Sequence, residues 1–88
     1  MDAETRVDVL KRLNYIDGHL QGIRKMVQEE QYCVDVMKQA FAVRRAIEKM
    51  EAKMLDGHLH HCVAEAVQRG ETDDVFGELV ELYRLANK

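Results

Sequence analysis

The chain has 88 residues, of which 47% are hydrophobic and 33% are charged, and it contains neither proline nor tryptophan. This composition is typical of a single small folded domain over residues 1–88 and excludes a disordered tail. No apolar run approaches the ~20 residues that cross a bilayer, and the first residues do not form a secretory signal. We therefore expect a cytoplasmic protein that has no membrane partner.

The charges are unevenly distributed along the chain. Residues 1–54 carry ten Lys/Arg against nine Asp/Glu, whereas residues 55–88 carry three against seven, and the net charge is −3. A polyanion such as DNA would therefore meet a local basic stripe on the first part of the chain. The scarcity of aromatic residues, 6% of the chain, disfavours a surface that stacks single-stranded bases.

The first segment predicts a long helix from about residue 4 to residue 29. Its apolar residues recur every three or four positions, at Val7, Leu10, Leu13, Ile16, Leu20, Ile23 and Val27. The next three residues, Glu29 to Gln31, break this pattern and predict a tight turn.

A second long helix is predicted over residues 32–69. Its apolar positions are Val36, Ala40, Val43, Ile47, Met50, Met54, Leu59, Val63 and Ala66. Gly57 costs this helix ~1 kcal/mol but does not end it, whereas Gly70 provides a C-terminal stop. Thr72 or Asp73 then caps a short, acidic third helix.

The predicted fold class is all-α, with a three-helix protomer of two long antiparallel helices and a short third. A hairpin of two amphipathic helices leaves one apolar face open, so we expect it to pair with a second copy in a four-helix bundle. The third helix would cover an end of this bundle or join dimers into a larger assembly. The protein is thus expected to be a homo-oligomer.

The residues with distinctive chemistry are two cysteines and a histidine cluster: Cys33, His58, His60, His61 and Cys62. Cysteines in a cytosolic chain are more often reactive or metal-binding than disulfide-bonded. Cys33 and His58 would lie ~37 Å apart along one helix, so they cannot meet within one chain. His58 and Cys62 share a helical face, and antiparallel pairing would place Cys33 of a second chain beside them.

Two thiolates and one imidazole without a carboxylate suit three-coordinate Cu(I). Zn(II) would need a fourth ligand, which His61 or water can supply, and Ni(II) is a further candidate in vitro. The plainer alternative is that both cysteines are small packing residues and the histidines are solvated helix surface. His19 is expected to be a surface or inter-helix polar residue.

The sequence resembles the copper-sensing repressors of the CsoR type, in the CsoR/RcnR/FrmR family of metal-sensitive repressors. The resemblance covers nearly the whole chain and rests on these positions: Gly18, Gly22, Ile23, Met26, Tyr32, Cys33, Asp35, Val36, Gln39, Ala42, Val43, Arg44, Gly57, His58, Cys62 and Val63. It implies a dimer of dimers that represses genes by binding operator DNA when metal-free and leaves the DNA when Cu(I) binds.

The resemblance also implies roles for individual residues. The metal ligands would be Cys33, His58 and Cys62, with Tyr32 and Glu78 as their outer partners. The DNA-facing basic residues would be Arg12 and Lys49, and three further cations extend this stripe on physical grounds. These are Lys11, Arg44 and Arg45.

Other members of the family sense other signals. Nickel or cobalt sensors use an extra N-terminal His, but no His precedes His19 in this chain. Formaldehyde sensors use a Pro at the second position, where this chain has Asp2. Persulfide sensors keep the two cysteines but lack the intervening histidine, so His58 favours a metal.

Three rival functions follow from the same residues. A thiol-based persulfide or redox sensor would use Cys33 and Cys62 alone, and a purely structural helical module would use none of the three predicted ligands. An enzyme is disfavoured, because no nucleophile and base share a helical face with an activating third group.

Overall fold

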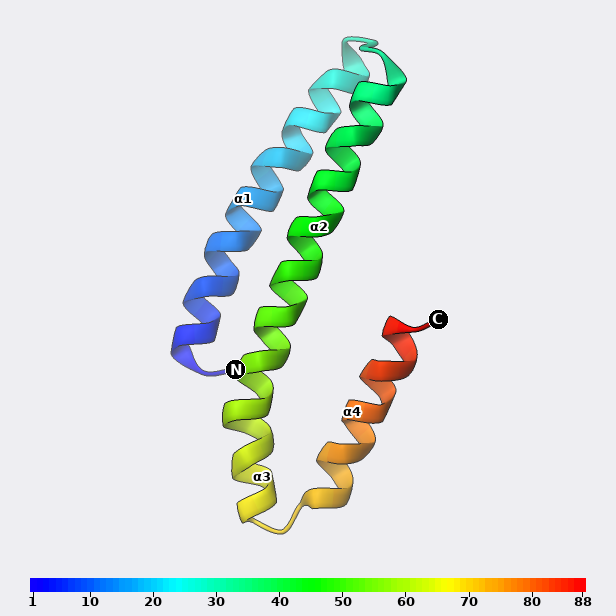
Figure 1. Ribbon diagram of the computed structural model, residues 1–88. Coiled ribbons are helices and arrows are strands. Elements are labelled where there is room, and N and C mark those ends of the chain that lie inside the picture. Colours follow the sequence, from blue (N-terminus) through cyan, green and yellow to red (C-terminus); the bar gives the residue numbers. More distant parts are fainter.

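The computed structural model describes residues 1–88 and is all-helical (Figure 1). Its elements are α1 (Ala3–Gln28), α2 (Cys33–Gly57), the π-helical turn η1 (His58–Val63), α3 (Ala64–Gln68) and α4 (Thr72–Ala86). The predicted fold class, two long helices and a short third, is confirmed. No helix has the length and apolar character needed to cross a membrane.

The predicted second helix is a continuous rod, but it is not α-helical throughout. Gly57, His58, Val63 and Ala64 all have right-handed helical backbone angles, so α2, η1 and α3 follow one another without a break. The expectation of a regular α-helix over residues 32–69 is wrong at His58–Val63, where the backbone forms a π turn. A π turn adds one residue to a helical turn, and this rotates everything after it by about 100° relative to α2.

The predicted turn between the long helices is confirmed and has a defined geometry. The N–H of Glu30 donates to the carbonyl of Val27 (3.1 Å), and that of Gln31 donates to the carbonyl of Met26 (3.0 Å). This pair of bonds is the Schellman ending of a helix, which requires a left-handed residue. Glu30 occupies that position with φ 55°, although glycine is the residue that favours it.

Gly70 ends α3 in the same way, as the sequence predicts. Its φ is +78°, its N–H donates to Val67 (3.1 Å), and the N–H of Glu71 donates to Ala66 (2.9 Å). The predicted side-chain cap of the last helix is wrong, because α4 begins at Thr72 and Glu71 at its N-cap makes no capping bond. Only one residue separates the left-handed glycine from the helix, so Thr72 already lies in the first turn.

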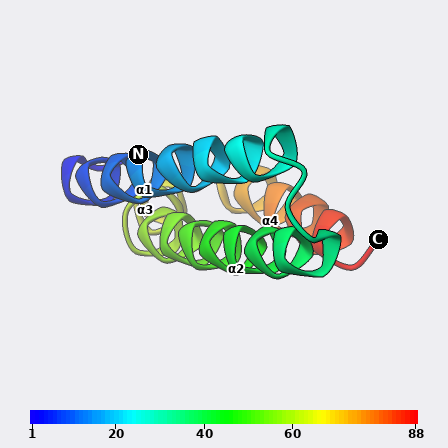
Figure 2. The ribbon, with the colours of Figure 1, turned by 90° about the horizontal axis from the view of Figure 1, so that it is seen from above.

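The long helices pack side by side and antiparallel, as both views show (Figures 1 and 2). Val9 and Ile16 of α1 and Val43 of α2 are buried in this hairpin. One hydrogen bond crosses between the helices, from His19 Nε2 to Gln39 Oε1 (2.7 Å), which confirms His19 as an inter-helix polar residue.

α4 packs against the end of the rod. Val75 forms a buried cluster with Val63 and Ala66, and Leu79 packs against it. Val63 closes the π turn and Ala66 follows it, so this cluster lies directly after η1. The chain thus has two small cores, one in the hairpin and one where α4 joins α3.

A single chain buries little of its apolar surface. Only eight of the 88 residues are buried, and the Cα atoms extend over 56 × 29 × 13 Å, so the molecule is about one helix thick. Large apolar side chains stay exposed on α4: Phe76, Val80, Leu82, Tyr83 and Leu85. Both broad faces of this layer are therefore available for packing.

Candidate metal centre

Cys33 lies at the first position of α2, directly after the inter-helix turn. Its thiol is free and exposed, and Tyr32 before it is also exposed (67%). Tyr32 holds the N-cap position without donating or accepting a capping bond. Both side chains are therefore available to groups outside this chain.

His58 and Cys62 both lie in the π turn η1, and both are half-buried. Cys62 is a free thiol. Because a π turn closes over five residues rather than four, four positions fall just short of one full turn. The two side chains therefore stay on nearly the same side of the rod. The predicted shared face is kept, but the helix that provides it is a π turn rather than an α-helix.

The structure does not bring all three predicted ligands together within one chain. Cys33 and His58 are 25 positions apart, the length of α2, which corresponds to ~37 Å along the axis. No group of three His, Cys, Asp or Glu side chains is placed to hold a metal ion. Of the two predicted outer partners, Glu78 is exposed on α4, and Tyr32 is at the far end of α2 from His58.

Cys33 and His58 nevertheless point to the same side of α2. Twenty-five positions are close to seven whole turns of ~3.6 residues, so the two side chains differ by only about 20° around the axis. Ala40, Ile47 and Glu51 share this side at heptad-like spacing. The two predicted ligands thus stand at opposite ends of one stripe.

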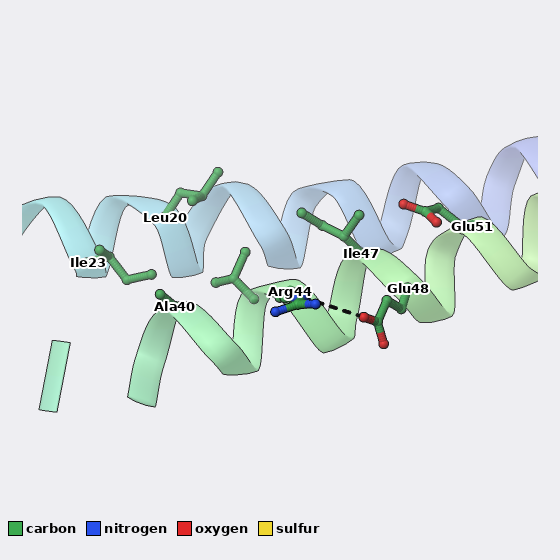
Figure 3. A pocket seen from close by; sticks show the side chains of 8 residues that line it. Leu20, Ile23, Ala40, Arg44, Ile47, Glu48 and Glu51 are labelled. Atoms are coloured by element: carbon green, nitrogen blue, oxygen red, sulfur yellow. Dashed lines mark ion pairs between the residues drawn. The ribbon is translucent and has the colours of Figure 1, made fainter. Parts of the chain in front are cut away.

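That stripe forms one wall of an open apolar groove between the long helices (Figure 3). Leu20 and Ile23 contribute from α1, and Ala40 and Ile47 contribute from α2. Arg44 lies at the edge of the groove, with Nε 3.7 Å from Oε1 of Glu48. The groove is therefore an apolar surface with an ion pair at its rim.

Four of the five predicted DNA-facing cations do not line this groove. Lys11 lines a second hollow together with Lys53, and Arg12 pairs with Asp8, also of that hollow, at 3.0 Å. Lys49 lies about 140° around α2 from Arg44, and it shares a side with Arg45, four positions before it. Arg44 differs from the other four because it lines the apolar groove.

The two histidines between His58 and Cys62 have defined partners. His60 Nδ1 donates to the backbone carbonyl of Asp56 (2.9 Å) and lies 3.3 Å from its carboxylate. His61, the predicted accessory ligand, places Nε2 3.7 Å from Oδ2 of Asp2. The two histidines between these predicted ligands therefore face carboxylates.

Asp2 also caps the first helix. Its Oδ2 accepts the N–H of Thr5 (3.0 Å). Hydrogen bonds from the Thr5 side chain and backbone lower the pKa of Asp2 below its ordinary 3.8, the charge of His61 lowers it further, and burial opposes the shift. The N-terminus is thereby attached to the segment that carries His58 and Cys62.

Gly57 has a role that the sequence did not reveal. A Cβ at this position would overlap the Thr5 side-chain oxygen and would lie 2.8 Å from its methyl carbon. Thr5 and Gly57 are both buried. The lone glycine inside an apolar-periodic helix was the available signal, since such glycines often permit a close approach.

Comparison with known proteins identifies the family. The model of the metal-sensitive transcriptional repressors matches residues 5–85. The copper-sensing transcriptional repressor CsoR of Bacillus subtilis is 35% identical over 86 residues, which are 98% of this chain and 85% of that protein. The copper-sensing repressor RicR of Mycobacterium tuberculosis is 43% identical over 60 residues, 68% of this chain and 62% of that protein.

Solved structures show the same relationship in three dimensions. The copper-sensing repressor CsoR with Cu(I) from Geobacillus thermodenitrificans superposes with a TM-score of 0.93 at 31% identity, over 100% of this chain and 92% of that one. The nickel-responsive regulator InrS superposes with a TM-score of 0.75 at 33% identity, over 96% and 92% of the two chains. This chain belongs to the family of metal-sensitive transcriptional repressors.

Proposed function

We propose that this protein represses transcription by binding duplex operator DNA when metal-free and releases the DNA on binding Cu(I). Its site would combine Cys33 of one chain with His58 and Cys62 of a second. It would act through binding, in the cytoplasm and as a single domain over residues 1–88, rather than as an enzyme. The support comes from the donor set, the placement of its members on α2, and relatives named as copper-sensing repressors.

The side chains fit Cu(I) by their chemistry. Cys33 and Cys62 are free thiols, and the imidazole of His58 is half-buried beside one of them. Soft sulfur ligands select Cu(I), and three ligands satisfy it. Zn(II) would need a fourth donor, for which His61 is adjacent, and the nickel-responsive relative makes Ni(II) a further candidate.

The placement of Cys33 and His58 at the two ends of one stripe carries the proposal. A second copy packed antiparallel along the apolar groove would place its Cys33 next to His58 and Cys62 of this chain. Two-fold symmetry would create the same site again at the other end. The exposed apolar side chains of α4 would then join two such dimers into a dimer of dimers.

The opposite side of the hairpin would meet DNA. Lys11, Arg12, Arg45 and Lys49 lie away from the groove and can contact phosphates, which supply affinity without reading the sequence. Arg44, which lines the groove, would instead contribute at the dimer edge. A second chain would bring its Tyr32 near His58, and Glu78 could accept a hydrogen bond from the second ring nitrogen of His58.

Anaerobic Cu(I) titration against a competing chelator tests the site. The wild type should bind about one Cu(I) per chain, and Cys33→Ala, His58→Ala and Cys62→Ala should each weaken binding at least about ten-fold. His60→Ala is the matched control, because His60 faces Asp56 and its loss should leave affinity nearly unchanged. The metal-free protein is then used to select a duplex from a random library. Binding of this duplex, measured with and without Cu(I), tests whether Cu(I) releases DNA.

The second candidate function is a thiol-based persulfide or redox sensor. The free Cys33 and Cys62 would meet between chains in the same antiparallel arrangement. A polysulfide would act as the oxidant: one thiolate takes its terminal sulfur and releases a shorter polysulfide, and the second thiolate then displaces hydrosulfide to form the disulfide. His58→Ala separates the two functions, since it should abolish the response to Cu(I) but spare the response to polysulfide. Retained Cu(I) binding in this variant would favour the thiol sensor.

A further inference from the structure

The N-cap and first turn of α1 contact the rod on both sides of His58. Thr5 packs on the backbone of Gly57, one residue before His58, and Asp2 lies beside His61, one residue before Cys62. These contacts connect residues more than 50 positions apart in sequence. Figure 1 shows the N-terminus beside the lower end of α2, where this junction lies.

The Thr5 contact leaves no free space. Its methyl carbon and Cβ lie 2.8 Å and 3.0 Å from where a Cβ of Gly57 would stand, so the side chain fills the place that glycine vacates. Thr5 is the polar residue that the chain buries, at 7% exposure, and its N–H is bonded to Asp2. A movement of Gly57 along or around the rod therefore requires Thr5 to move with it.

The segment following Gly57 is suited to such a movement. π turns are rare single-turn insertions that concentrate at functional sites, and their hydrogen bonds can shift register by one residue. A Cu(I) ion bound by His58 and Cys62 would act directly on this turn. α1, in turn, carries Lys11 and Arg12 within two further turns of Thr5.

We infer that Thr5 is a positioning residue for the metal response: its contact with Gly57 couples the ligand-bearing π turn to α1 and so to the basic side of the hairpin. This inference rests on the proposed Cu(I) site. It adds a connection from the site to α1, separate from the proposed hydrogen bond between His58 and Glu78. Thr5 itself touches neither metal nor DNA.

Hydrogen exchange on the full-length reduced protein, with and without one equivalent of Cu(I), tests this coupling. In the wild type, Cu(I) should change amide exchange in residues 3–12 of α1 as well as around η1. Thr5→Ala removes the atoms that fill the space and should lose the α1 response while the η1 response remains. Thr5→Val keeps the shape and should retain both.

Release of the selected duplex gives a second readout. The ratio of DNA affinities without and with Cu(I) should fall about five-fold or more in Thr5→Ala, with Cu(I) affinity unchanged, and stay near wild type in Thr5→Val. Val9→Ala is the matched control, because Val9 is equally buried (7%) one turn further along α1. Its release ratio should be normal despite lost stability.

Several outcomes would overturn the inference. Thr5 would contribute only stability if Cu(I) changed amide exchange in the wild type around η1 alone. The same would follow if Val9→Ala reduced the DNA-release ratio as much as Thr5→Ala does. Equal loss in Thr5→Ala and Thr5→Val would assign the effect to hydrogen bonding by the hydroxyl rather than to the packing of the side chain against Gly57. Each of these leaves the Cu(I) site intact, whereas a wild type that binds no Cu(I) refutes the proposed function and this inference together.

Discussion

Cys33 and His58 stand at opposite ends of α2 and project from the same side of it. Their 25-residue separation is close to seven helical turns, so the length of the helix keeps them apart while its periodicity aligns them. The groove between them is apolar, open, and lined by both long helices. A site that combined the three predicted ligands would therefore need a second chain in the antiparallel orientation.

Substitution at Gly57 tests the close approach of the two long helices. Gly57→Ala should lower the free energy of unfolding by about 1–3 kcal/mol, because the new methyl group overlaps Thr5. Gly18→Ala is the matched control, since a Cβ there meets nothing within 4 Å and should stabilise α1. Urea denaturation at one fixed protein concentration measures both, since an oligomer's stability depends on concentration.

Combining Gly57→Ala with Thr5→Ala in one double-mutant cycle measures the interaction free energy between the two residues. The double variant should be more stable than the sum of the two single losses predicts, because Thr5→Ala removes two of the three atoms that the new methyl group meets. Strictly additive losses would contradict the contact.

The inter-helix turn offers a stabilising substitution. Glu30 has φ 55°, a left-handed conformation that costs a non-glycine residue about 1 kcal/mol. Glu30→Gly should therefore raise the unfolding free energy by about 0.5–1 kcal/mol. Glu29→Gly should give no such gain, because Glu29 has φ −86°. Thermal or urea unfolding of the two variants distinguishes them, and an equal response would contradict the assigned turn.

Acid should weaken the attachment of the N-terminus. The pKa of Asp2 is lowered in the folded protein, chiefly by hydrogen bonds from Thr5, so its ionised form contributes stability that is fully present above its ordinary pKa of 3.8. This contribution is lost as the pH falls through the lower, folded-state pKa. Asp2→Asn keeps a capping oxygen but no charge.

The unfolding free energies of the wild type and Asp2→Asn should therefore differ by a constant amount at neutral pH and converge in acid. Urea unfolding across this range measures the difference. A gap that widens toward low pH would contradict the sign of the shift.

The two sides of the hairpin should respond differently to loss of a cation. Lys49→Ala should weaken binding of the selected duplex and reduce the slope of log affinity against log salt by about one, as expected for a phosphate contact. Arg44→Ala should leave that slope unchanged, because Arg44 lines the groove beside Glu48. Fluorescence anisotropy at several salt concentrations gives both slopes, and equal slopes would contradict this division.

Periodicity and turn residues predicted most of the fold. The apolar spacing located α1 and the long rod, and Gly70 marked the end of α3 because only a left-handed residue closes that turn. The π turn at His58–Val63 was not predicted, although the apolar spacing carries a trace of it, since Met54 and Leu59 are five positions apart where an α-helix repeats every three or four. Thr72 does not cap α4, because the helix begins only two residues after Gly70 and Thr72 already lies in its first turn. The sequence does not show where a helix begins to within one residue.

The site was predictable in its residue types but not in its surroundings. The spacing of Cys33, His58 and Cys62 indicated a ligand set divided between chains, and this remains a prediction that a single chain does not test. The contacts of Thr5 with Gly57 and of Asp2 with His61 join distant parts of the sequence. Such long-range contacts leave no local pattern, so they became visible only in three dimensions.

Complementation between two defective chains tests the shared site most directly. A Cys33→Ala chain and a His58→Ala/Cys62→Ala chain, each with a different affinity tag, are co-expressed and purified through both tags. Because each mixed dimer contains one intact site, the account predicts about one Cu(I) per co-purified pair and tight binding in neither variant alone. Absence of tight binding in the mixed dimer, or tight binding by either variant alone, would contradict a site built from two chains.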